Sequence, residues 1–260
     1  MEVIIQSNLQ TASHLAARHL AAQLRKKPDL VIGIPSGETP VAMFKDLIRM
    51  HRDEGLDFSQ ATIFGLDEFI GLAPTHPASH RVGAQRALLD QINVRPDRIF
   101  FPKADSQDVQ AACTAYEDAI RDAGGIDVQV LGIGPAGHLG FNEPTSSLAS
   151  RTRSKTLTPR TRKDFSNQFG DESMVPNYIM TMGLGTLLDT REVMLLAFGA
   201  PKADVIGRAI EGPVTSVMPA SVLQLHPMVK VFLDEDAASR LQHTSYYRWV
   251  FQMKPEWQKF

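Results

Sequence analysis

The sequence is short of cysteine, of net charge and of long apolar runs. Its single cysteine, Cys113, excludes an intramolecular disulfide and a cysteine-rich metal centre, and the alanines around it predict a small buried residue on a helix. Lys and Arg number 27 against 29 Asp and Glu, so the chain lacks the basic excess that is typical of nucleic-acid-binding proteins. No apolar run approaches the roughly 20 residues that span a bilayer, and the N-terminus has no signal-peptide pattern. We therefore expect a cytoplasmic protein with no membrane or nucleic-acid partner.

What the chain has is the length and composition of a globular protein: 260 residues, 43% hydrophobic and 22% charged. Apolar runs predict strands at 3–5, 30–34, 61–66, 126–133, 193–198 and 229–233, and helical spacing predicts helices at 9–24, 41–50, 82–92, 109–122 and 202–210. This repeated succession predicts one α/β domain over residues 1–260. Its expected architecture is a doubly wound, mostly parallel sheet with helices on both faces, a Rossmann-like three-layer sandwich.

Two local features refine this prediction. Thr39 is expected to be an N-cap with Pro40 in the first helical position, since both residue types suit those places. The segment 145–176 shows neither strand nor helix periodicity, so we expect it to be irregular and to form a lid over a site.

Polar clusters follow the predicted strands at the points where the strands end. In a parallel sheet these ends share one edge, where ligands bind, so the clusters predict one active site. The loop Ser36–Thr39 joins a strand to a helix and could hold an anion on its backbone N–H groups, or could be a simple turn. Lys202 opens a predicted helix, where the helix dipole disfavours a cation. It therefore suits either an anionic ligand or an ordinary surface position.

Acid–base chemistry is the second prediction from these clusters. Asp67 and Glu68 end a hydrophobic strand, where a carboxylate can act as a base or simply cap a helix. His138 and Glu143 lie five residues apart in a glycine-rich turn. The carboxylate could fix the imidazole tautomer for proton transfer, although a structural histidine is the alternative. No second His or Cys stands at ligand spacing, so we expect no metal.

These residues closely resemble the glucosamine-6-phosphate deaminase family. The resemblance rests on Gly132–Pro144 with 146–156, Pro35–Pro40, Leu66–Leu72, Pro219–Pro227 and the stretch around 199–202, and it covers nearly the whole chain. It implies conversion of an amino-sugar phosphate, glucosamine 6-phosphate, into fructose 6-phosphate and ammonia without a cofactor. His138 would assist ring opening, Asp67 would carry a proton between C2 and C1, and Glu143 would hold His138. The phosphate would be held by Ser36, Gly37, Glu38, Thr39 and Lys202.

The sequence departs from the family at four positions. Ala136 stands where an Asp or Asn is usual, so one hydrogen-bond partner of His138 is lost. Glu38 replaces a small residue in the phosphate loop, His80 replaces a usual Tyr, and Asn167 falls where a phosphate-binding Arg is usual. These changes leave two alternatives open: a divergent isomerase or deaminase for a different, less anionic or non-phosphorylated sugar, and a sugar-phosphate sensor without activity. A sugar-phosphate lactonase is a third.

A basic stretch begins at residue 151. It is either a solvated face or an anion site. The resemblance implies the second, because four residues match the effector site between subunits of regulated members: Ser146, Arg151, Arg153 and Lys155. Oligomeric state varies in the family, so a homo-oligomer is possible here.

Overall fold

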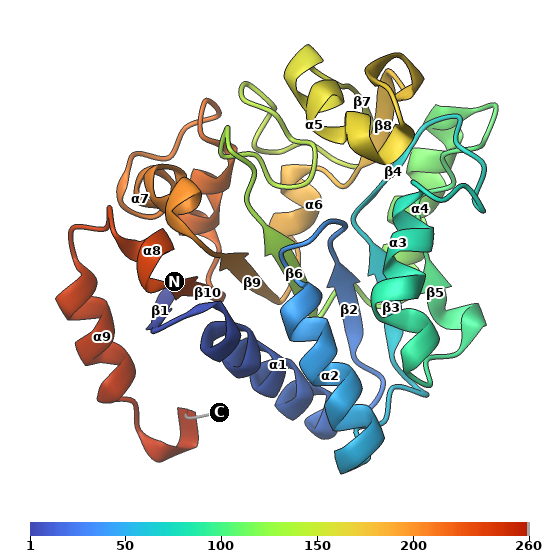
Figure 1. Ribbon diagram of the computed structural model, residues 1–260. Coiled ribbons are helices and arrows are strands. Elements are labelled where there is room, and N and C mark those ends of the chain that lie inside the picture. The colour runs from blue at the N-terminus through green and yellow to red at the C-terminus, as the bar shows by residue number, and fades with distance from the viewer. Residues whose placement is uncertain (259–260) are drawn as a thin grey trace.

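The computed structural model describes residues 1–258 and is built on a seven-stranded sheet (Figure 1). Every pair of neighbouring strands runs parallel. In spatial order the strands are β1 (Glu2–Gln6), β10 (Val229–Asp234), β9 (Glu192–Ala197), β6 (Val128–Gly132), β2 (Val31–Ile34), β3 (Thr62–Gly65) and β5 (Ile99–Phe100). The order reverses direction between β2 and β6: the chain leaves β2 toward β3 on one side and leaves β6 toward β9 on the other.

Helices cover both faces of this sheet. One hydrophobic core joins it to α1 (Leu9–Lys26), α2 (Val41–Glu54) and α3 (His80–Ala87), and a second joins it to α4 (Val109–Asp122), α6 (Leu184–Leu188), α7 (Ala203–Glu211) and α8 (Glu235–Ala238). Successive strand residues alternate between the two cores, as Leu195 and Leu196 do, because side chains along a strand point to opposite faces. The predicted doubly wound, three-layer architecture is confirmed.

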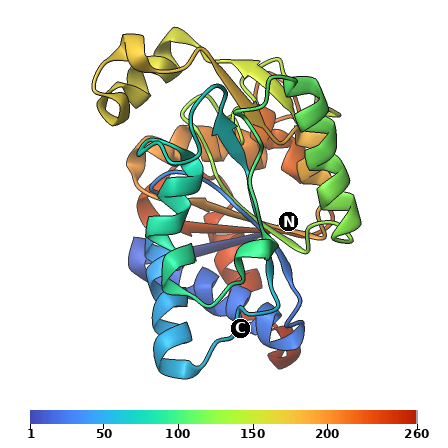
Figure 2. The same ribbon diagram turned by 90° about the vertical axis from the view of Figure 1, so that its right-hand side faces the viewer.

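A second, three-stranded antiparallel sheet lies beyond the carboxyl ends of the main strands (Figures 1 and 2). It consists of β4 (Asp67–Phe69), β8 (Tyr178–Thr181) and β7 (Arg153–Thr156), with α5 (Pro159–Phe169) beside it. The prediction that 145–176 is irregular is therefore wrong. Strand β7 contains mostly polar residues, and α5 is largely polar with Phe165 and Phe169 as its main apolar contacts, so neither contains enough apolar residues to be recognised from the sequence. Whether this segment acts as a lid stays a prediction.

Several helix starts also differ from prediction. Pro40, not Thr39, is the N-cap of α2, and no side chain bonds the first turn, so Thr39 is not a cap. Helix α3 begins at His80 because Ser79 caps it, and α7 begins one residue after Lys202. Helix α9 (Thr244–Gln252), which the sequence did not predict, lies at the C-terminal end. Short 3-10 helices occupy Leu89–Gln91, Pro96–Arg98, Glu172–Met174, Ala200–Lys202, Pro219–Leu225 and Glu256–Gln258.

None of the helices within residues 1–258 combines the length and apolar character needed to cross a bilayer.

Candidate active site

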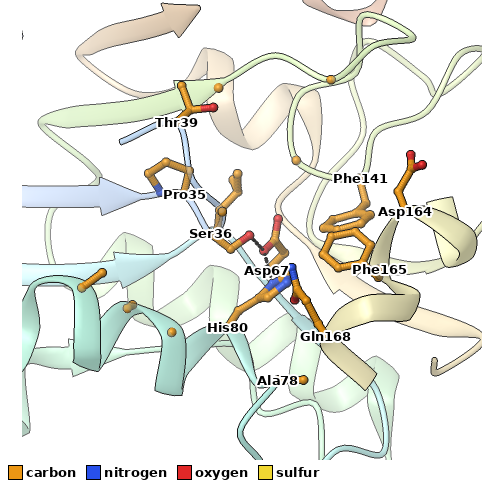
Figure 3. A pocket seen from close by; sticks show the side chains of 18 of the residues that line it. Pro35, Ser36, Thr39, Asp67, Ala78, His80, Phe141, Asp164, Phe165 and Gln168 are labelled. Carbon is orange, nitrogen blue, oxygen red and sulfur yellow. Dashed lines mark hydrogen bonds and ion pairs between the residues drawn. The ribbon is translucent and has the colours of Figure 1, made fainter. Parts of the chain in front are cut away.

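A cavity of about 440 Å³ opens where the order of the strands reverses, beyond the carboxyl ends of β2 and β6 (Figure 3). The loops after β2 and β6 and the start of β4 form one part of its wall. Helices α2, α3 and α5 and the segment before α3 supply most of the rest, so α5 lies where a ligand in this cavity would contact it. The reversal point of an open parallel sheet is where such folds bind ligands.

Asp67 is 1% exposed and lies at the cavity wall. Its Oδ1 accepts a hydrogen bond from Ser36 Oγ at 2.9 Å and contacts His80 Nδ1 at 2.6 Å. Its Oδ2 is buried and has no hydrogen-bond partner among residues 1–258. One oxygen of this carboxylate is therefore held by two side chains, while the other is buried in the cavity wall without a partner.

The neighbouring carboxylate, Glu68, has a different environment. Its Oε1 accepts from the backbone N–H groups of Phe69 and His80, and its Oε2 accepts from Ser79 Oγ and the N–H of Arg81. Glu68 thus satisfies the start of α3 and has no oxygen left for chemistry. The structure thus gives Asp67 and Glu68 different roles, which the sequence alone did not distinguish.

The loop after β6 carries the predicted proton-transfer pair. His138 Nδ1 lies 3.3 Å from Glu143 Oε2, an ion-pair distance, but it is buried and its geometry makes no hydrogen bond. Glu143 Oε1 accepts a hydrogen bond from Thr161 Oγ1 of α5 at 2.8 Å. His138 lowers the pKa of Glu143, and the bond from Thr161 adds to this against the opposing effect of partial burial. Ala136 has no side-chain group that could bond this imidazole.

Four of the five residues predicted to bind phosphate lie in the loop after β2, and three of these four line the cavity. Ser36, Gly37 and Thr39 line the cavity, whereas Glu38 is exposed and does not. A carboxylate at Glu38 therefore does not oppose an anion inside the cavity.

Lys202 lies beside the cavity rather than among its lining residues. Its Nζ donates to the carbonyl of Ile133, which does line the cavity, at 2.7 Å. Partial burial lowers the pKa of this ammonium. The Lys202 ammonium is thus held at the rim of the cavity, against the loop that carries His138.

The four residues predicted for an effector site do not share one cavity. Arg151 lines a separate cavity next to α4 and makes ion pairs with Glu117 and Asp189. Ser146 is buried with its Oγ unpartnered. Arg153 bonds the carbonyl of Arg151. Neither Ser146, Arg153 nor Lys155 lines that cavity, so effector binding stays a prediction.

Sequence reasoning missed several residues of the wall: Phe141, Thr161, Asp164, Phe165 and Gln168. Four of these come from α5, which was predicted to be irregular. Asn167, on the same helix, is exposed and does not line the cavity. His80 was noted only as a departure from the family, yet it contacts Asp67 directly. Within residues 1–258, no three His, Cys, Asp or Glu side chains group closely enough to hold a metal ion.

The fold and the cavity define an α/β protein with an acid–base site for a small polar ligand. The chain belongs to the glucosamine-6-phosphate isomerase/6-phosphogluconolactonase family, whose model matches residues 6–231. It is 48% identical over 258 residues to a glucosamine-6-phosphate deaminase of an Arthrobacter species, covering 99% of both chains. It is 46% identical over 259 residues to a glucosamine-6-phosphate deaminase of Streptomyces coelicolor, again covering 99% of both chains.

Solved structures give the same grouping. A monomeric glucosamine-6-phosphate deaminase matches with a TM-score of 0.90 and 37% identity, over 92% of this chain and 100% of that one. The 6-phosphogluconolactonase of Trypanosoma brucei matches with a TM-score of 0.73 and 20% identity, over 92% of this chain and 98% of that one. At that identity the second likeness concerns the fold alone.

Proposed function

We propose that this protein converts glucosamine 6-phosphate and water into fructose 6-phosphate and ammonia. The observation that carries the proposal is the buried Asp67 carboxylate in the wall of the cavity that His138 also lines, with one oxygen held by Ser36 and His80 and the other without a partner among residues 1–258. Full-length relatives named glucosamine-6-phosphate deaminase support it at 46–48% identity. Because phosphorylated sugars are charged and do not cross membranes, the proposal includes action in the cytoplasm.

Ring opening is the first step of the proposed mechanism. His138 takes the proton from O1 and delivers it to the ring oxygen, so the sugar becomes an open-chain aldehyde. Glu143 stabilises the imidazolium that forms during this transfer, as its ion-pair distance of 3.3 Å allows. Both groups come from one loop, so the turn itself sets their spacing.

Isomerisation follows on the open chain. Asp67 takes the proton from C2 through its unpartnered Oδ2 and returns it to C1, passing through an enol-type intermediate. This leaves a C=N bond at C2. Water adds to that carbon, and ammonia leaves as the C2 carbonyl of fructose 6-phosphate forms. All protons are supplied by the sugar, by water and by these side chains.

The phosphate is held by the loop after β2 in this proposal. Ser36, Gly37 and Thr39 line the cavity ahead of α2, where backbone N–H groups favour an anion. Lys202 adds a positive charge at the rim beside Ile133. No arginine of α5 lines the cavity, and Asp164 does, so phosphate binding here relies on the loop and one lysine.

Ammonia release tests the proposal directly. Purified protein incubated with glucosamine 6-phosphate is expected to release ammonia, and His138→Ala is expected to lose about 10²–10⁴-fold in kcat, the usual contribution of a general acid–base group. Fructose 6-phosphate measured in the same samples should equal the ammonia. If this substrate gave no ammonia and another hexosamine did, the protein would be a deaminase for that other sugar. A thermal shift with no turnover of any hexosamine would indicate a sensor.

Restoring a carboxylate near His138 is expected to increase activity. Ala136→Asp places an acceptor two residues before a histidine whose Nδ1 is buried and unpartnered. A charge-assisted hydrogen bond is worth about 1.5–3 kcal/mol, which corresponds to about a ten- to hundredfold rise in kcat. Steady-state kinetics of Ala136→Asp and Ala136→Leu, which adds volume without an acceptor, check this. An equal kcat in wild type and Ala136→Asp would mean that Glu143 already satisfies the histidine.

A further inference from the structure

The contact between His80 and Asp67 is the strongest feature of the cavity that the proposed mechanism does not use. His80 Nδ1 lies 2.6 Å from Asp67 Oδ1, and the two side chains are 6% and 1% exposed. His80 also lines the cavity, and Figure 3 shows its ring directed at the Asp67 carboxylate. A buried imidazole at this distance from a buried carboxylate forms a strong hydrogen bond with it.

The ring of His80 is fixed from several sides. Its backbone N–H donates to Glu68 Oε1, because His80 begins α3. Phe69 lies 4.7 Å from its ring centroid, and Phe141 stacks at 6.0 Å with an interplanar angle of 22°. These contacts leave the imidazole one orientation, so it fixes the carboxylate oxygen that it contacts.

The charges around His80 favour its protonated form. Burial alone would lower the pKa of the imidazole, but the Asp67 carboxylate, its hydrogen bond and the more distant Glu68 outweigh burial and raise it. The remaining charged or titratable side chains near it are Arg81 on its own helix, and His138 and Asp164 on other parts of the cavity wall. The Asp67 carboxylate therefore keeps the imidazole in its charged form to a higher pH than an isolated histidine.

We propose that His80 is a positioning residue for Asp67: it holds Oδ1, which leaves Oδ2 as the oxygen that exchanges a proton with the sugar, and it places a positive charge beside the base. The inference rests on the proposed function for the reaction that Asp67 performs. His80 itself exchanges no proton with the sugar in this scheme. It retains its Nδ1 proton while Oδ2 takes the C2 proton and returns it to C1.

Two variants separate the hydrogen bond from the charge. His80→Asn places an amide N–H near the position of Nδ1 without the charge, and His80→Phe removes both. We expect His80→Phe to lose about a hundredfold in kcat at every pH, with KM changed less than threefold. We expect His80→Asn to keep kcat within about tenfold above pH 8, but to lose activity at a higher pH than wild type on the acid side. His51→Asn is the matched control, because His51 Nδ1 bonds the backbone of Leu56 instead.

Stability gives a readout that does not depend on turnover. Because the folded-state pKa of His80 is raised above its unfolded value of 6.5, its stabilising effect is complete below that value and is lost as the pH rises through the folded pKa. Urea unfolding should therefore show a larger difference between wild type and His80→Asn at pH 6 than at pH 9.

Imidazole NMR decides the pairing itself. The His80 ring should remain protonated to a pH above the ordinary imidazole pKa of 6.5, and this should be lost in Asp67→Asn. A His80 ring with a pKa at or below 6.5 would overturn the inference whatever the enzyme does. So would a His80→Phe variant with wild-type kcat and pH profile. Absence of ammonia release from wild type would overturn the proposed function instead, and the NMR result would still stand on its own.

Discussion

Replacing Asp67 by Asn is expected to reduce ammonia release from glucosamine 6-phosphate by about 10²–10⁴-fold, the range of general acid–base catalysis. The change is nearly isosteric, and the amide oxygen can still accept the hydrogen bond of Ser36 at the place of Oδ1. The amide nitrogen at the place of Oδ2 cannot take a proton from C2. Exchange of the C2 hydrogen with D₂O, followed by NMR, should fall together with ammonia release, while a thermal shift with the substrate should remain.

The adjacent acid provides the control for this experiment. Glu68→Gln is expected to lower stability rather than kcat, because the amide nitrogen replaces one of the two oxygens and cannot accept the two hydrogen bonds that this oxygen accepts at the start of α3. Urea unfolding of both variants separates the two effects. An Asp67→Asn variant with activity near wild type would contradict the proton transfer and would favour a lactonase-like reaction, in which an activated water attacks the substrate.

The main sheet was predictable because most of its strands are runs of apolar residues that can be recognised in the sequence. Residues such as Leu195 and Leu196 are both buried, on opposite faces, so β9 is a continuous apolar run that any parallel sheet requires. The second sheet has no such signal. Strand β7 is Arg-Ser-Lys-Thr, and its strand conformation depends on pairing with β8, more than 20 residues later in the chain. That pairing cannot be inferred from the residues of β7 and their neighbours in the sequence.

The same distinction holds for the site. The glycine-rich turn of His138 and the acid at Asp67 could be found from the ends of predicted strands. The division of work between Asp67 and Glu68 could not, because it depends on N–H groups that α3 brings back from more than ten residues away. The position of Glu38 outside the cavity and of Lys202 at its rim likewise depends on turns whose geometry the residue types alone do not determine.

A single methyl group at Gly134 is expected to abolish most of the activity without unfolding the protein. A Cβ at this position would overlap the Nε2 end of His138, so Gly134→Ala cannot coexist with the observed imidazole position. The overlapping atom is the far end of a side chain that can rotate, so the fold can relieve the clash by moving the ring. The loss should then approach that of His138→Ala, about 10²–10⁴-fold in kcat.

The measurements for Gly134→Ala are kcat, KM and the urea midpoint, made beside the same values for Gly207→Ala. Gly207 lies in α7, and a Cβ there comes no closer than 3.4 Å to the backbone of Arg240, so this control should keep wild-type kinetics. If Gly134→Ala unfolded at a much lower urea concentration, the clash would be disrupting the loop rather than displacing the His138 ring. If it kept wild-type kcat, His138 would not need its observed position, and the ring-opening role assigned to it would fail. Loss of kcat with an unchanged urea midpoint is the result that links the glycine to the proton transfer by His138.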